Sequence, residues 1–420
     1  MRLKSAISAL LAMGSLMLPT KTATAIEQAP PVSPAATSTN QFNWDLYSTV
    51  AKDEKGNLFY SPYSIESALA MTFSGAKNKT AAEMARVLHL DSKTYAAAPD
   101  SVHVAFGDLQ KQINASSDLG DFRAFDLVVA NAIWGQKGYQ FNPAFTGILK
   151  DRYAAGLEQL DFKSGDASVE ASRLTINRWV EKQTRDKIKN LVAKGAVDQT
   201  TRMVLTNAIY FKSKWDSTFE KSDTKDKPFS TDAKTKVDVP TMHQVTTASY
   251  AEDDAVQVLE LPYKFHRLSM VLVLPKKIEG LAAVESSLND KSIANWTGKL
   301  EACRVNIALP KFKFTTQLGL AKTLKKMGMV DAFGDKADFT GITTEEPLLI
   351  SEVIHQAFVD VNEEGTEAAA ATAVIMAAGS AMPREMKNVS FHADRPFLFI
   401  IRDNTTSTIL FTGRVMNPKE

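Results

Sequence analysis

The chain has 420 residues, of which 44% are hydrophobic and 23% are charged, and this composition excludes an intrinsically disordered protein. Its formal net charge is +1, so it lacks the strong field that favours nucleic acid or an anionic membrane, and we expect neither as a partner. The length allows one large domain or two ordinary ones.

The N-terminus has the three parts of an export signal. A basic start at residues 1–4 precedes an apolar stretch at residues 6–18, which is too short to span a bilayer, and residues 23–25 form an Ala-Thr-Ala cleavage sequence. A buried N-terminal helix is the alternative reading of this pattern. We predict a signal peptide over residues 1–25 and export to the periplasm or the extracellular space, with no membrane anchor after cleavage.

One domain is expected after this signal. Residues 29–40 are rich in Pro, Ser, Thr and Ala, so we predict a flexible spacer over residues 26–40 and a single domain over residues 41–420. Thr80 and Glu83 match a capping box, which predicts a helix N-terminus. Apolar spacing predicts further helices ahead of Thr184 and over residues 318–329, with Gly328 near the end.

Strand patterns dominate the second half of the chain. The expected strands are residues 203–211, 256–261, 268–274, 304–314, 357–361, 397–402 and 408–415, with a turn at residues 403–405. Cys303, the only cysteine, lies in a strand-like alternation and is predicted to be a core residue. Helices before and among largely antiparallel strands indicate an α+β architecture.

No familiar catalytic motif is present in the sequence. It lacks G-x-S-x-G, H-E-x-x-H, a P-loop and G-x-G-x-x-G, and its six histidines have no pair at metal-ligand spacing. Catalytic triads assemble in space, so these absences make an enzyme less expected without excluding one. We expect no enzyme activity, no cofactor and no metal.

Four separated stretches resemble the landmarks of the serpin family. They are residues 57–65 with 68–71 and 75–76, residues 206–215, residues 355–372, and residues 391–399, in the family's order. The family usually has glycine where this chain has Ser213, which we place at a surface-type position. The resemblance implies the serpin fold, in which helices pack on a large, mainly antiparallel sheet with further sheets, and a reactive loop is exposed near the C-terminus.

The resemblance also implies what this loop does. In serpins it is bait for a protease, and after cleavage it enters the main sheet as an extra strand that drags the acylated protease along. Alternate residues from Thr366 to Ala378 would enter the core, and none of them is charged. Read alone, this Ala-rich window favours a helix, but the other landmarks reverse that preference. The implied hinge residues are Glu363, Gly365, Thr366, Glu367, Ala368, Ala369, Ala370, Ala371 and Thr372.

Insertion requires a sheet that opens, and the resemblance assigns residues to this step. Trp215 matches the tryptophan where the loop first enters the sheet. Lys311 and Glu363 match a pair that restrains the hinge, which as an exposed ion pair would be worth about 0–1 kcal/mol. The residues matched at the opening point can exchange hydrogen bonds between two strand arrangements, although each alone would read as a satisfied core residue. These are Ser61, Ser64, Asn207 and His355.

The family's hinge-to-bond spacing places the scissile bond at Gly379-Ser380, with Met376, Ala378 and Ala381 as near alternatives. The small residues around this bond suit an elastase-like or subtilisin-like serine protease. Counting back from the last landmark gives residues 382–385 instead. There a proline follows Met382 and makes a poor bond, whereas the Arg-Glu bond at 384–385 would suit a trypsin-like enzyme.

We therefore predict a monomeric, exported serine-type endopeptidase inhibitor. It would act as a suicide substrate, trapping its target serine protease as an acyl-enzyme by loop insertion into the main sheet. The alternative is a non-inhibitory serpin that acts as a binding or chaperone-like protein. Such members often have charged or bulky hinge residues, which this chain lacks at Thr366 and residues 368–371. An exported hydrolase is the third and least favoured class.

Overall fold

The computed structural model describes residues 33–90, 98, 100–115, 118–119, 122–123, 125–366 and 386–420. The predicted signal peptide and most of the predicted reactive loop, residues 367–385, lie outside these ranges. None of the helices within them is both long enough and apolar enough to cross a membrane.

A six-stranded sheet contains the residues that the sequence assigns to loop entry and sheet opening. Its strand order is β12-β13-β14-β6-β4-β5, and β13 and β6 also pair directly with each other, in parallel. β6 pairs antiparallel with β4, and β12 with β13. The strands are β4 (Asp126–Gln136), β5 (Leu157–Leu160), β6 (Met203–Lys214), β12 (Phe312–Gly319), β13 (Glu352–Asn362) and β14 (Gly365–Thr366).

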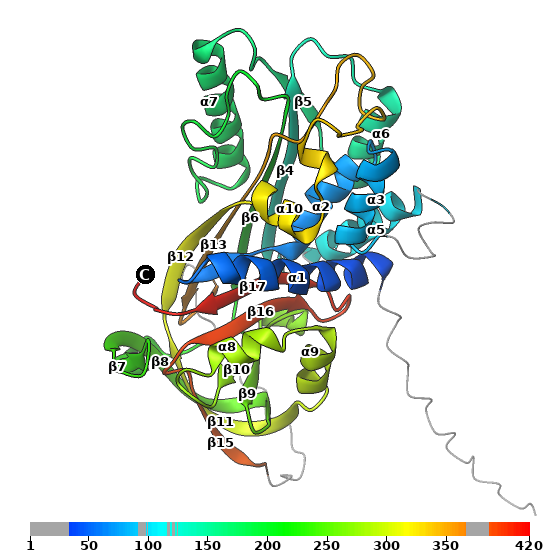
Figure 1. The fold of residues 1–420 in the computed structure, drawn as a ribbon. Coiled ribbons are helices and arrows are strands. Elements are labelled where there is room, and N and C mark those ends of the chain that lie inside the picture. Colours follow the sequence, from blue (N-terminus) through cyan, green and yellow to red (C-terminus); the bar gives the residue numbers. More distant parts are fainter. Residues whose placement is uncertain are drawn as a thin grey trace, which may run out of the picture. The chain divides into compact units, whose positions relative to one another are not determined.

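Helices cover both faces of this sheet (Figure 1). α7 (Asp166–Gln183) packs Ile176 and Val180 against one face, in a buried cluster with Trp134 of β4 and Val204 of β6. On the other face α2 (Pro62–Phe73) contacts β4 and β6, and nearly all of its residues are buried. The sheet is thus an inner layer, which explains why β6 is buried along almost its whole length.

A second, nine-stranded sheet has the order β1-β17-β16-β10-β9-β8-β11-β15, with β7 paired to β8. All its pairs are antiparallel except β11 with β15, which forms one edge. Its strands are β1 (Leu58–Tyr60), β7 (Lys225–Ser230), β8 (Lys236–Glu252), β9 (Val256–Pro262), β10 (Leu268–Pro275), β11 (Glu301–Pro310), β15 (Asn388–His392), β16 (Phe397–Asp403) and β17 (Ile409–Val415).

The remaining described elements are helices and one small hairpin. The helices are α1 (Pro34–Asp53), α3 (Asn78–Val87), α5 (Asp100–Ala115), α6 (Pro143–Tyr153), α8 (Leu281–Ser286), α9 (Asp290–Thr297) and α10 (Ala321–Met327). Short 3-10 helices are η1 (Lys221–Asp223), η2 (Lys264–His266) and η3 (Asp331–Phe333), and β2 (Asp118–Leu119) pairs with β3 (Phe122–Arg123).

α1 corrects part of the predicted spacer. Ser33 caps this helix, because its Oγ accepts a hydrogen bond from the Ala36 N–H at 3.1 Å, and Pro34 occupies the first helical position. Residues 34–40 are therefore helical, and Ala35 and Ala36 are fully buried. Serine and proline are common in spacers, which is why a spacer was predicted. A serine followed by a proline is also typical of a helix N-terminus, and this is the role of Ser33 and Pro34 here.

The α+β architecture and most predicted strands are confirmed. Residues 203–211, 256–261 and 268–274 lie in β6, β9 and β10. The predicted strand over residues 304–314 is divided between two strands, because the chain leaves one sheet at the end of β11 and enters the other at β12. The predicted helix over residues 318–329 is shorter, although Gly328 does end α10, with a φ of 109°.

The predicted capping box does not start a helix. α3 begins at Asn78, and the Oγ1 of Thr80 instead accepts a hydrogen bond from the Asp338 N–H at 2.9 Å. Glu83 accepts the N–H groups of Val330 and Asp331 at 2.8 and 2.7 Å. The two side chains thus join α3 to a distant segment, a role that local sequence spacing does not reveal.

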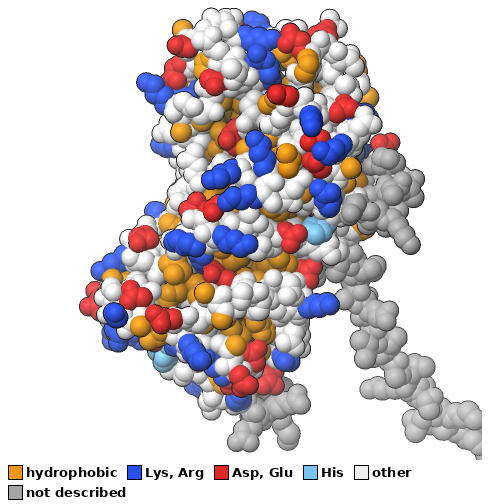
Figure 2. All heavy atoms as spheres, viewed as in Figure 1, with side chains coloured by type: hydrophobic (Ala, Val, Ile, Leu, Met, Phe, Trp, Pro, Cys, Tyr) orange, Lys and Arg blue, Asp and Glu red, His pale blue; other side chains and the backbone are white. Residues whose placement is uncertain are grey.

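Acidic and basic side chains are intermixed on the face of the molecule drawn in Figure 2. This distribution agrees with the formal net charge of +1. The face shown therefore has no large region of a single charge sign that would attract a polyanion.

Candidate functional site

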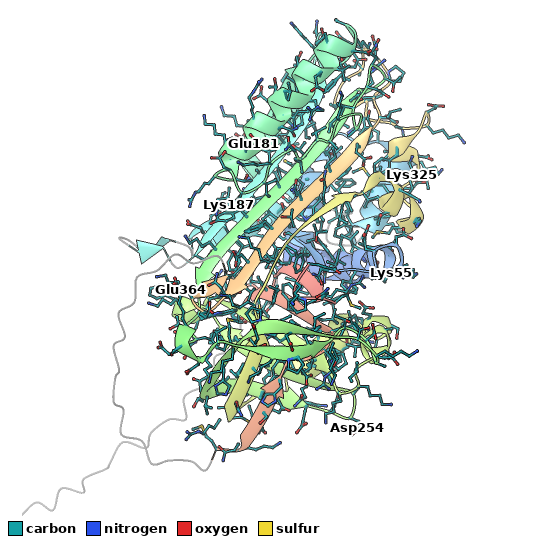
Figure 3. The ribbon with its side chains drawn as sticks, turned by 90° about the vertical axis from the view of Figure 1, so that its left-hand side faces the viewer. Lys55, Glu181, Lys187, Asp254, Lys325 and Glu364 are labelled. Carbon is teal, nitrogen blue, oxygen red and sulfur yellow. The ribbon has the colours of Figure 1, made fainter. Side chains whose placement is uncertain are left out.

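The two residues of β14, Gly365 and Thr366, belong to the predicted hinge and lie inside the six-stranded sheet. β14 pairs antiparallel with the last two residues of β13 on one side and with Ser213 and Lys214 of β6 on the other. Glu364, labelled in Figure 3, marks this end of the sheet. The start of the loop thus occupies a strand position in the uncleaved chain.

Gly365 is fixed by the close approach of β6. Its φ is 153°, and an added Cβ would lie 2.1 Å from the carbonyl oxygen of Ser213 and 2.7 Å from the Cα of Lys214. Both of these atoms belong to the backbone, so rotating a side chain cannot relieve the overlap. Glycine is the residue type that this position admits.

Thr366 points into the core next to two stacked aromatic rings. It is 1% exposed, and its Oγ1 lies 2.7 Å from the hydroxyl oxygen of Tyr263. The Tyr263 ring stacks on Trp215 with a centroid separation of 4.6 Å. Trp215 in turn donates its indole N–H to the carbonyl of Asn362 and its backbone N–H to the carbonyl of Glu364, both at 3.0 Å. Trp215 therefore sits directly at the entry point of the loop.

The ion pair of Lys311 and Glu363 is not exposed as predicted. Glu363 is 5% exposed, and its carboxylate lies 2.9 Å from the Lys311 Nζ and accepts the Thr224 hydroxyl at 2.9 Å. Burial raises the pKa of this carboxyl, but the hydrogen bonds, chiefly from Lys311, outweigh it and hold the pKa below its usual value. A hydrogen bond to a buried charge contributes about 1.5–3 kcal/mol, more than an exposed pair.

The neighbouring Glu364 ties the hinge to the same surface segment. Its Oε1 lies 2.9 Å from the Lys221 Nζ, whereas its buried Oε2 has no hydrogen-bond partner among the described residues. The backbone N–H of Phe219 donates to the Glu363 carbonyl at 2.9 Å. Ser213, across β14, is 4% exposed, so its predicted surface position is wrong. Its backbone is the one that approaches residue 365.

A row of polar side chains crosses three strands below the hinge. Asn131 of β4 is opposite Asn207 of β6, which is opposite His355 of β13. Asn207 donates its amide to Asn131 and to the Ser64 hydroxyl, and bonds through its oxygen to the Nδ1 of His355. The backbone N–H of Ser61 donates to the Nε2 of His355 at 3.3 Å. The predicted residues of the opening point are thus brought together in one network.

His355 is neutral in this network. It is fully buried, and burial lowers its pKa to about 3. Because Nε2 accepts a hydrogen bond, the proton of the neutral ring sits on Nδ1 and is donated to Asn207. The network lies where β13 and β6 pair directly, between Glu352 and Ala357 of β13, so this is the closed part of the sheet.

The rest of the predicted loop lies outside the described residues. This applies to the hinge residues Glu367, Ala368, Ala369, Ala370, Ala371 and Thr372 and to the predicted reactive bond at Gly379 and Ser380. Elsewhere, Cys303 of β11 is fully buried, which confirms it as a core residue, and burial raises the pKa of its thiol. Within the described ranges, no group of three His, Cys, Asp or Glu side chains could hold a metal ion.

Sequence reasoning missed several residues of this site. Asn131 lies in β4, a strand that the sequence pattern did not suggest, and its signal is a polar residue facing inward from a long apolar segment. Tyr263 follows a predicted strand, and only the fold brings its hydroxyl to Thr366. Thr224 and Lys221 lie on a surface turn without any local motif.

Comparisons with known proteins agree with the predicted fold. A family model described as "Serpin (serine protease inhibitor)" matches residues 37–418. Serpin B3 of Homo sapiens is 40% identical over 392 residues, which cover 90% of this chain and 98% of that protein. The leukocyte elastase inhibitor of Xenopus laevis is 41% identical over 385 residues, covering 90% of this chain and 97% of that protein.

Solved structures are similar over the same length. Uncleaved ovalbumin superposes with a TM-score of 0.80 at 29% identity, covering 91% of this chain and 100% of that chain. Serpin48 of the insect Tenebrio molitor has a TM-score of 0.77 at 34% identity, covering 91% of this chain and 98% of that chain.

Proposed function

The chain belongs to the serpin family, and from this premise we propose that it is a suicide inhibitor of serine-type endopeptidases that traps its target by loop insertion. One observation supports the proposal above all others: β14 lies between β13 and β6, with Thr366 buried beneath the sheet. The loop therefore does not have to find its place after cleavage. Insertion proceeds by lengthening a strand that has already begun.

Two neighbouring strands, β13 and β6, can pair with the residues that would extend β14. β13 and β6 pair with each other only up to Ala357 and Ile209, so the following residues of both strands are not paired to one another. Each new ladder hydrogen bond contributes about 0.5–1.5 kcal/mol net, so an inserted strand is favoured over its absence. Alternate residues after Thr366 are uncharged through Ala378, so no charge has to be desolvated.

The trapping reaction uses the target's own catalytic groups. The serine hydroxyl attacks the carbonyl of Gly379 while the target's general base takes its proton; the bond to Ser380 then breaks, and the amine leaves with that proton while an ester remains. Insertion then competes with hydrolysis of this ester. Roughly 14 residues from Thr366 to Gly379, at about 3.3 Å each, would form a strand about 46 Å long, and its lengthening would drag the esterified protease along the sheet. The chain itself contributes no catalytic group, and we propose no enzyme activity for it.

The target class follows from the bait and from a relative. Small residues flank the proposed bond at Gly379, which suits the shallow pocket of an elastase-like or subtilisin-like protease. A protein named leukocyte elastase inhibitor is 41% identical to this chain, which supports an elastase-like target. We propose export on the basis of the predicted signal sequence over residues 1–25, and N-terminal sequencing of the recovered protein tests it. We also propose a monomer, which light scattering of the purified protein tests.

The inhibitory activity is tested by incubation with elastase-, subtilisin- and chymotrypsin-like proteases. We expect a complex that survives SDS, and mass spectrometry of the released C-terminal peptide identifies the bond. If every protease in the panel cleaves the loop without forming a complex, the non-inhibitory alternative is favoured.

Insertion itself is tested with two neighbouring substitutions that differ only in the face of the strand they would occupy. Ala370→Arg would place a charge on the core side, as Thr366 does, whereas Ala369→Arg would place it on the opposite side. We expect Ala370→Arg to turn the inhibitor into a substrate and Ala369→Arg to retain inhibition. Full inhibition by Ala370→Arg would contradict the insertion mechanism.

A further inference from the structure

A carboxyl group lies in the interior between α1 and α2. Glu66 of α2 is 0% exposed, and the hydroxyl of Thr39 on α1 donates to its Oε2. Its Oε1 is also buried and has no hydrogen-bond partner within the described part of the chain. A charged carboxylate is strongly disfavoured in such surroundings, because water is excluded and one oxygen is left unpaired.

α1 also carries a second buried group that lacks a partner among the described residues. Asn43 lies one helical turn beyond Thr39, and its Oδ1 accepts hydrogen bonds from Tyr60 and Thr412 at 2.9 and 2.8 Å. Its amide nitrogen is buried without a partner. α1 therefore packs through buried polar groups, against α2 at Glu66 and against β1 and β17 at Asn43.

Among the residues that the structure describes, no counter-charge stabilises an ionised Glu66. Burial raises its pKa to about 8, opposed only by the hydroxyls of Thr39 and Ser38. The other titratable or charged groups on the elements packed around α2 do not affect this pKa. These groups include Tyr47 of α1, bonded to Glu285; Glu83 of α3, paired with Lys79; His103 of α5, bonded to Tyr153 of α6; Asp126 of β4, paired with Arg185; Tyr210, Lys212 and Lys214 of β6; and Arg414 of β17, paired with Glu285.

We propose that Glu66 is a proton-controlled brace between α1 and α2, which holds the helices together as a neutral acid and loosens α2 when its proton is lost to solvent. α2 matters because its first turn presents Ser61 and Ser64 to His355 and Asn207. Ser64 and Glu66 are two residues apart on this helix, so a shift of one moves the other. Loosening α2 weakens the network that keeps β13 and β6 closed.

The direction of the pH effect follows from where the proton is held more tightly. The folded protein keeps the Glu66 proton up to about pH 8, whereas the unfolded chain releases it near 4.5. The stabilising effect of the neutral acid is complete below about pH 4.5 and is lost as pH rises to about 8, with the unfolding equilibrium constant rising up to tenfold per pH unit. Above that range this group has no further effect.

His355 titrates with the opposite sign and defines the useful window. Burial lowers its pKa from 6.5 to about 3, so its effect on stability is complete by about pH 7. A fall in stability between about pH 7 and 8 therefore cannot come from His355. This pH range is the one in which the effect of Glu66 is tested.

The experiment compares the full chain with Glu66→Gln and with Glu279→Gln, a matched change at an exposed carboxyl. Melting temperatures and the rate of spontaneous loss of inhibition are measured from pH 6 to 9 at constant salt. We expect the wild type and Glu279→Gln to melt lower and inactivate faster as pH rises, and Glu66→Gln to give a flat profile between pH 7 and 8. Parallel profiles for all three proteins would overturn the proposal.

A direct titration keeps the proposal testable if Glu66→Gln does not fold. The infrared band of a protonated carboxyl in the intact wild type is followed from pH 6 to 9. One carboxyl losing its proton near pH 8 is expected, and its absence overturns the brace. Only the inactivation arm depends on the proposed function. Melting and infrared measurements need no protease, so a failure of inhibition leaves them decisive.

Discussion

Replacing Gly365 by alanine tests whether the hinge keeps its strand position because residue 365 has no side chain. The added Cβ would lie 2.1 Å from the carbonyl oxygen of Ser213. Keeping β14 in place would cost about 1–3 kcal/mol of backbone strain, before the overlap is counted. Leaving the sheet would forfeit the bond between Thr366 and Tyr263 and the ladder bonds of β14, at about 0.5–1.5 kcal/mol each. Either route lowers the stability of the uncleaved protein by about 2–4 kcal/mol.

The assay measures melting temperature and the moles of inhibitor consumed per mole of protease. Gly195→Ala is the control, because Gly195 also has a positive φ, 83°, but an added Cβ there meets no atom within 4 Å. We expect Gly365→Ala to consume more inhibitor per protease, since the same overlap hinders insertion, and Gly195→Ala to match the wild type in this ratio. Equal ratios and equal melting of the two variants would refute the reasoning.

Three further predictions concern the surroundings of the hinge. Lys311→Met leaves the buried carboxylate of Glu363 without its ammonium partner, so melting at pH 7 should fall by the equivalent of about 1.5–3 kcal/mol. The lowered pKa of Glu363 means that this loss should shrink as pH falls below about 4.5, and melts from pH 3 to 7 check it. Tyr263→Phe removes the hydroxyl partner of Thr366, at about 0.5–1.5 kcal/mol, and should speed limited proteolysis of the hinge. His355 must stay neutral when buried, so below pH 6.5 it should lower stability by up to about 1.4 kcal/mol per pH unit, against the opposite effect of Glu66. The stability difference between the wild type and His355→Gln should therefore change with pH by that amount, and a constant difference would contradict the assignment.

The sequence predicted the strands that are buried on both faces, but it did not show which strand belongs to which sheet. Continuous apolar runs identify β6 and β10, because only a covered strand can be apolar on both sides. Within the predicted strand over residues 304–314, the sequence pattern does not mark the end of β11 and the start of β12. The pattern continues smoothly through Lys311, and the change of sheet is decided by partners far away in the chain.

The candidate site divides in a similar way. The resemblance located the hinge and the opening point, because their residues lie in recognisable stretches. It did not give the burial of Glu363, since burial comes from the fold around the carboxylate and not from the pair itself. Nor did it give Asn131, which completes the polar row with Asn207 only through the register of β4 against β6.

The polar row explains how a sheet can be closed and still be ready to open. Each hydrogen bond among Asn207, His355 and Ser64 contributes only about 0.5–1.5 kcal/mol net, because water or a new partner can replace it. Leaving a buried donor or acceptor unpaired costs about 1–3 kcal/mol, so an intermediate with broken and unreplaced bonds is disfavoured. The polar row therefore adds little to the free energy that holds the sheet closed, and it adds more to the free-energy barrier to opening. Substituting apolar residues of similar size should remove that obstruction, so that insertion without a protease becomes faster even where melting changes little.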